Sequence, residues 1–200
     1  MKATLLFLTL GGLFFLTSCS SEDDSGGNMT PNNEPEPLEI GDLHQGGIIF
    51  YLDATGEQGL VVALQDQSSS ASWCSNAEEI DGADGESLGD GAQNTSDIIR
   101  ACEESNNAAA RCDNLNSNGF ADWYLPSIGE LEEIASNIAI INTALEENGG
   151  TSIALETYWS SSELNVGSVS SAQTYSFEFD VVGSQTKFGT AYVRAVRAFD

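Results

Sequence analysis

The chain has 200 residues, with 31 acidic and 6 basic side chains and a formal net charge of -25. Such an excess of negative charge excludes nucleic acid as a partner, because phosphate binding needs clustered Lys and Arg. A single His and four Cys leave little material for a His-based active site or a zinc site. The 40% hydrophobic content indicates a chain that folds.

Residues 1–18 have the form of a signal peptide. Lys2 precedes an apolar run over 3–16 that is too short to span a membrane comfortably. The run ends in Leu16-Thr17-Ser18-Cys19, which resembles the lipobox of bacterial lipoproteins. The resemblance implies cleavage before Cys19, lipidation of its thiol and acylation of the new amine. We therefore expect Cys19 to be a membrane anchor.

Residues 19–39 are rich in Ser, Asp, Glu, Gly, Asn and Pro, and are predicted to be a disordered, acidic tether. The segment 20–24 (SSEDD) resembles the acid-rich export signal of some Gram-negative surface lipoproteins. It is equally compatible with a solvated charge run in a linker. We expect an outer-membrane lipoprotein that faces the cell exterior, and display toward the periplasm is the alternative.

Residues 40–200 are long enough for one buried core. Apolar runs at 48–52 and 60–64 flank a turn and predict a β-hairpin. Residues 65–92 are predicted to be mostly loop. A short helix capped by Thr95 or Ser96 is expected next, followed by a second helical stretch.

Ser127 and Glu130 have the spacing of a capping box, which predicts the start of a helix. The C-terminal third is predicted to be β. Residues 175–181 alternate aromatic or apolar with polar side chains, as a half-buried strand does. Gly183-Ser184 is predicted to turn the chain, and the last strand to span 191–199.

Five motifs occur in an order that resembles one family of bacterial surface domains, typified by the C-terminal domain of the Legionella collagen-like adhesin. They are Gly46–Tyr51, Gly89–Thr95, Asp122–Ser127 with Glu130-Leu131, Tyr158–Glu163 and Val193–Arg197. The resemblance implies an α+β, C-type-lectin-like fold, with two helices around a small, twisted, mostly antiparallel sheet and the chain ends close together. The family's named adhesin binds sulfated polysaccharide.

Trp159 and Trp123 lie in two of these motifs and are candidate sugar platforms, because an indole face stacks on pyranose CH groups. The alternative is that both tryptophans are core residues. Ser160, Ser161 and Glu163 offer hydroxyls and a carboxylate for a polar ligand rim. They are also suited to holding a loop through bonds to backbone.

Arg194 is a candidate for binding a carboxylate or sulfate on a ligand. With Arg197, it is more typical of structural ion pairing, with Asp122 or Glu163 as partners. The sequence has no Gly-x-Ser-x-Gly elbow and no His suited to the serines, so we expect no hydrolase triad and no enzyme.

An acidic, Gly-rich segment is a candidate calcium site, because calcium takes oxygen ligands. Its spacing misses the EF-hand pattern, so a solvated loop is favoured and no other cofactor is expected. The candidate ligands are Asp81, Asp84, Glu86 and Asp90.

Three cysteines remain once Cys19 is lipidated, so export predicts one disulfide and one thiol. Cys102 and Cys112 fall on the apolar faces of neighbouring predicted helices and are the first candidate pair. Cys74 with Cys102 is the rival pair.

The prediction for the whole chain is a surface-anchored lipoprotein with a non-catalytic binding domain. Its partner is a neutral glycan or a host or cell-surface protein, since the acidic charge repels sulfated polymers. The membrane is contacted only through the lipid anchor, and the oligomeric state is left open. The alternatives are a structural or accessory subunit of a surface complex and, below it, an enzyme of unrecognised type.

Overall fold

The computed structural model describes residues 36–75, 78–166 and 169–200. Internal contacts group Glu36–Asp200 into one unit. The predicted signal peptide, the lipidated Cys19 and the tether up to residue 35 lie outside the described residues. In the described ranges, every helix is too short or too polar to cross a bilayer.

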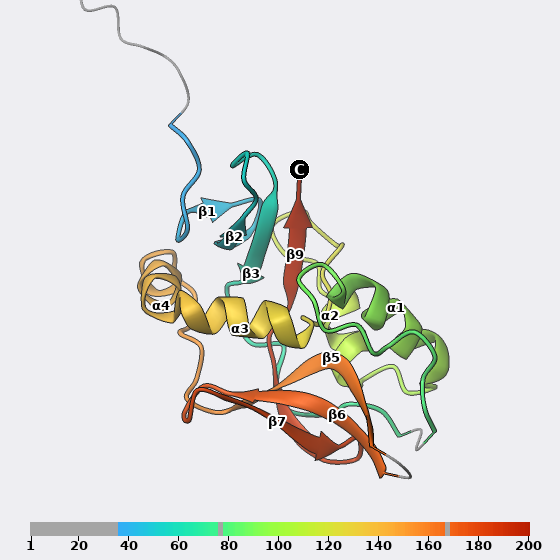
Figure 1. The fold of residues 1–200 in the computed structure, drawn as a ribbon. Helices are drawn as coiled ribbons and strands as arrows, with labels where there is room; N and C mark the ends of the chain where they lie inside the picture. Colours follow the sequence, from blue (N-terminus) through green and yellow to red (C-terminus); the bar gives the residue numbers. More distant parts are fainter. Residues whose placement is uncertain (1–35, 76–77, 167–168) are drawn as a thin grey trace, which may run out of the picture. The chain divides into compact units, whose positions relative to one another are not determined.

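The first sheet joins the two ends of the described unit. Its strands pair antiparallel throughout, and the predicted hairpin is confirmed as its β2–β3 pair. Figure 1 shows the early strands, in blue and teal, beside the last strand, in red. The sheet runs in the order β1 (Leu43–His44), β2 (Gly47–Leu52), β3 (Gly59–Ala63) and β9 (Val196–Phe199).

The second sheet has five strands, and its pairs are antiparallel except for β5 with β8. The β7 strand lies at its edge. The order is β4 (Ser68–Ser72), β8 (Thr190–Val193), β5 (Thr157–Val166), β6 (Val169–Ser176) and β7 (Val181–Thr186).

Three predictions about strands are wrong in detail. Residues 175–181 are a strand end, a turn and a strand start, because Asp180 adopts a φ of 53° and turns the chain. Gly183-Ser184 therefore lies within β7. Residues 191–199 lie in two strands that belong to different sheets. The described part of the segment 65–92 is mostly loop, as predicted, and contains the strand β4.

The described residues form four helices, where the residue pattern predicts three and the family resemblance implies two. The capping box of Ser127 and Glu130 is confirmed. The first helix starts at Gly91, earlier than predicted, because Thr95 is buried and its Oγ1 accepts a hydrogen bond from the Leu125 backbone at 3.0 Å. The helices are α1 (Gly91–Ala101), α2 (Ala108–Asp113), α3 (Ile128–Ser136) and α4 (Ile138–Glu147).

The α3 helix lies between the two sheets and contacts β2, β5 and β6 (Figure 1). One apolar cluster packs α1 and α2 against the second sheet around Trp73, Trp123 and Trp159. A second cluster, around Phe50 and Tyr158, packs α3 and α4. Mixed helices and antiparallel-rich sheets confirm the α+β class.

Candidate functional site

Both candidate sugar platforms are interior side chains. Trp159 is 0% exposed, and its indole Nε1 donates to the carbonyl of Ala71 at 2.8 Å. Trp123 is 2% exposed and donates to the carbonyl of Phe120 at 3.1 Å. The prediction of exposed stacking faces is wrong, because each ring is covered by the core that it helps to form.

The serines of β5 hold a neighbouring loop. Ser160 Oγ donates to the Gln173 carbonyl at 2.8 Å, and Ser162 Oγ donates to the Gly85 carbonyl at 2.7 Å. Ser161 Oγ accepts from the Asn94 side chain at 3.2 Å. All three serines are buried and bonded to internal backbone or side-chain groups, so they do not line a ligand rim.

Glu163 is one half of a buried ion pair. Its carboxylate pairs with Lys187 and accepts from the Ile80 backbone at 2.7 Å. Lys187 also donates to the Glu78 carbonyl at 2.7 Å and lies over the Trp73 ring. Lys187 was not predicted as the partner, because it lies in the turn between β7 and β8 and meets Glu163 only in the folded chain.

Arg194 is likewise internal. Its Nε donates to Asp66 at 2.7 Å, and its Nη1 donates to the Ala63 carbonyl at 2.9 Å. Burial raises the pKa of Asp66 above its usual value, although Arg194 opposes the shift. The pairing of Arg197 with Asp122 is confirmed. The Nη2 of Arg194 donates to the Thr151 carbonyl at 3.0 Å, so all three guanidinium nitrogens are bonded inside the protein and Arg194 is too buried to line a ligand rim.

The candidate calcium ligands do not converge. Asp81, Asp84 and Glu86 are exposed, while Asp90 accepts from the Ser87 backbone at 2.8 Å. Among the residues that the structure describes, His, Cys, Asp and Glu form no group of three or more suited to a metal ion.

The disulfide joins Cys74 to Cys102, so the preferred pairing of Cys102 with Cys112 is wrong and the rival is correct. Cys112 is a buried free thiol, and burial raises its pKa. Cys102 is the C-cap residue of α1, and its sulfur is bonded to Cys74, which follows β4 in the chain.

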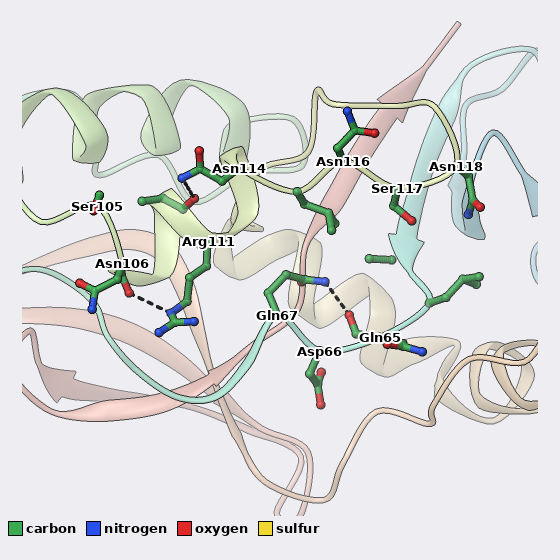
Figure 2. Close-up of a pocket in the computed structure, with 14 residues that line it drawn as sticks. Gln65, Asp66, Gln67, Ser105, Asn106, Arg111, Asn114, Asn116, Ser117 and Asn118 are labelled. Atoms are coloured by element: carbon green, nitrogen blue, oxygen red, sulfur yellow. Dashed lines mark hydrogen bonds between the residues drawn. The ribbon is translucent and has the colours of Figure 1, made fainter.

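A polar pocket of about 650 Å³ lies elsewhere, between the segment after β3 and the α2 region (Figure 2). The polar lining is mostly uncharged amides and hydroxyls. The pocket is lined by Ala63, Leu64, Gln65, Asp66, Gln67, Ser105, Asn106, Ala110, Arg111, Asn114, Leu115, Asn116, Ser117 and Asn118.

Several of these amides build the pocket walls. Gln67 Nε2 donates to the Gln65 carbonyl at 2.6 Å, and Asn114 Nδ2 donates to the Ala110 carbonyl at 2.7 Å (Figure 2). Asn118, at a φ of 53°, donates from its side chain to the carbonyl of Gly46, in the turn between β1 and β2, at 3.3 Å. The walls are therefore fixed by local bonds before any ligand arrives.

Three other amides are available to a ligand. Within the described part of the chain, the side chains of Gln65, Asn106 and Asn116 make no hydrogen bond, and all three residues are exposed. The Asn pair at 106–107 was not among the candidate site residues predicted from the sequence. The pattern that could have indicated the site is the run of amides between residues 106 and 118, which comes to lie beside Gln65 only when the chain folds.

The comparisons with known proteins identify one family. The family described as the Lcl C-terminal domain matches residues 62–197. The match takes in the whole pocket and four of the five motifs, and the motif at 46–51 lies outside it. No curated protein is similar enough to count as a relative.

Proposed function

The chain belongs to the family of Lcl C-terminal domains, and from that membership we propose that it is a surface adhesin-like protein that captures a glycan without catalysis. The amide-lined pocket is the proposed site. The family match confirms the resemblance that the five motifs indicated. The ligand, the anchor and the site are what we propose.

The polar lining of the pocket is the observation that supports a glycan. Carboxamides both donate and accept hydrogen bonds, which suits them to sugar hydroxyls that do the same. Gln65, Asn106 and Asn116 offer such groups without having to break existing bonds. A volume of about 650 Å³ lies in the range of small-ligand pockets.

The positions of the carboxyls whose pKa is raised favour a binding role over catalysis. Burial raises the pKa of Glu130 to about 7, but this side chain serves the capping box of α3 and does not line the pocket. Burial also raises the pKa of Asp66, which does line the pocket, but Arg194 and the Tyr158 hydroxyl hold its carboxylate. Both shifts therefore have a structural cause.

We also infer that the fold is C-type-lectin-like. The pairing of β3 with β9 brings the two ends of the described domain into one sheet, as the resemblance implies. The four helices of the described residues differ from the two that the resemblance implies. Superposition of a crystal structure on solved lectin domains tests the inference.

The anchor remains a proposal from the sequence. Cys19 is proposed to be lipidated, and the tether up to residue 39 to display the domain at the outer surface. Intact-mass analysis should find the mature chain starting at an acylated Cys19, and Cys19→Ser should release the protein from membranes. Labelling of intact cells by an impermeant reagent distinguishes exterior from periplasmic display.

A second candidate function is that of a subunit in a surface complex. The edge strand β7 and its flanking turns expose large apolar side chains, which is typical of a protein contact. They are Phe179, Val181, Val182 and Phe188, and Phe179 is 72% exposed.

A glycan panel tests the first candidate. The full chain should bind at least one glycan saturably, with calcium or with chelator. Gln65→Ala combined with Asn116→Ala should weaken binding about tenfold, the loss of roughly two hydrogen bonds. Gln58→Ala, an exposed amide in the turn between β2 and β3, is the matched control and should bind normally. If the chain binds none of the glycans, the second candidate function, a protein contact at the β7 edge, is favoured.

A further inference from the structure

The basic side chains of the described residues are almost all neutralised. Five of the six Lys and Arg residues lie in this part of the chain. Four of them are in ion pairs: Arg100 with Asp97, Lys187 with Glu163, Arg194 with Asp66 and Arg197 with Asp122. Arg111 is the exception within the described ranges, and it lines the amide pocket.

Arg111 is held in place, with donors left over. Its Nε donates to the Asn106 carbonyl at 2.8 Å, which fixes the guanidinium against the pocket wall (Figure 2). Its terminal nitrogens, Nη1 and Nη2, have no hydrogen-bond partner among the described residues. A guanidinium that is anchored through Nε and open at its outer edge is suited to two parallel bonds with a carboxylate.

The acids near Arg111 do not compete for it. The carboxylate of Asp66, on the same pocket, is held by Arg194 and by the Tyr158 hydroxyl at 3.1 Å. Asp113 is two residues along α2, and helix positions two apart do not face each other. In a chain of net charge -25, this pocket thus contains an unpaired cation among neutral amides.

We propose that Arg111 binds the carboxylate of an acidic sugar residue, while the free amides of Gln65, Asn106 and Asn116 bind its hydroxyls. The inference rests on the proposed function. It replaces the neutral glycan expected from the sequence with a glycan that carries a carboxylate. One carboxylate matches one guanidinium. A polysulfated chain would bring many anions close to the acidic surface of the protein. At physiological salt the screening length is roughly 8 Å, so repulsion between charges closer than this is only partly screened.

Paired sugars test the proposal on the full chain. Sialyllactose and galacturonate, which carry one carboxylate each, are titrated beside their neutral counterparts, lactose and galactose, by calorimetry. At least one acidic sugar should bind about tenfold more tightly than its neutral counterpart, the usual size of a charge-assisted contact that is partly exposed. Arg111→Gln should remove that preference, and Arg111→Lys should keep only part of it, because Lys lacks the planar pair of donors.

Arg100→Gln is the matched control. It removes the same charge from the neighbouring helix α1, where the side chain is 69% exposed and lies outside the pocket lining. The preference for the acidic sugar should survive this change. An equal loss in both variants would mean that overall charge, and not a site at Arg111, sets the preference, and it would overturn the proposal.

The outcomes also separate this inference from the proposed function. Equal affinity for acidic and neutral sugars, unchanged by Arg111→Gln, would overturn the carboxylate site and leave the glycan pocket standing. A peptide with a free C-terminal carboxylate is titrated as well. If it binds and neither acidic sugar does, the carboxylate that Arg111 recognises does not belong to a sugar, and the proposal is overturned. Binding of no sugar at all would overturn both proposals.

Discussion

Glu130 is a carboxyl that the fold surrounds completely. It is 0% exposed and accepts bonds from the Ser127 backbone at 2.8 Å, the Gly89 backbone at 3.0 Å and the Tyr124 hydroxyl at 3.2 Å. These donors favour the charged form, yet burial outweighs them and raises the pKa to about 7. The capping box could be predicted from two residues, but its burial could not, because the covering residues come from distant segments.

The raised pKa of Glu130 makes stability depend on pH. Between the ordinary value of 4.5 and about 7, the folded state holds a proton that the unfolded state releases. The free energy of unfolding should therefore fall as pH rises through this window, by roughly 3 kcal/mol at most. Urea unfolding from pH 4.5 to 8 measures it. Glu130→Gln should flatten this part of the slope, and identical slopes in the two proteins would contradict the assignment.

The buried pair of Lys187 and Glu163 gives a second prediction for single residues. Lys187→Met leaves a buried carboxylate without its cation and should cost about 3 to 5 kcal/mol of unfolding free energy. Adding Glu163→Gln should recover part of that loss. Arg100→Gln removes the exposed partner of Asp97, whose carboxylate also accepts a hydrogen bond from Gln93 at 3.0 Å, and should cost less than about 1 kcal/mol. Equal losses in denaturant unfolding for Lys187→Met and Arg100→Gln would show that the pair is not buried.

At the scale of elements, local pattern predicted some boundaries and missed others. The β2–β3 hairpin and the start of α3 followed from adjacent residues. The alternation over 175–181 continued through a turn, because a positive φ at Asp180 leaves no trace in a period-two pattern. The split of the last predicted strand into β8 and β9 depends on two sheets that the sequence does not separate.

The disulfide links two elements, because it joins the chain after β4 to the C-cap residue of α1. Its removal should therefore lower the stability of the fold. Cys74→Ala with Cys102→Ala should destabilise the protein by about 2 to 5 kcal/mol. Cys112 should resist thiol reagents in the folded protein and react on unfolding, because it is buried and its pKa is raised. Peptide mapping of the labelled chain measures this, and a labelled Cys74 would contradict the pairing.

At the scale of the whole molecule, the pocket is assembled from segments far apart in sequence. Residues 63–67 follow a strand of the first sheet, while residues 105–118 belong to α2 and its flanking loops. The aromatic and serine motifs that stood out in the sequence became core instead. They were conspicuous because large side chains and buried hydroxyls pack a domain, whereas scattered amides look like ordinary turns until folding gathers them.

The amide pocket as ligand site is the central claim, and backbone amide chemical-shift mapping tests it most directly. The full chain is titrated with the tightest-binding sugar of the panel. Saturable shifts should cluster at residues 64–67, 105–106 and 110–118, and should need about tenfold more sugar in the Gln65→Ala, Asn116→Ala double variant. Shifts that cluster instead at the β7 edge or the acidic segment 81–90, and persist in the double variant, would contradict it.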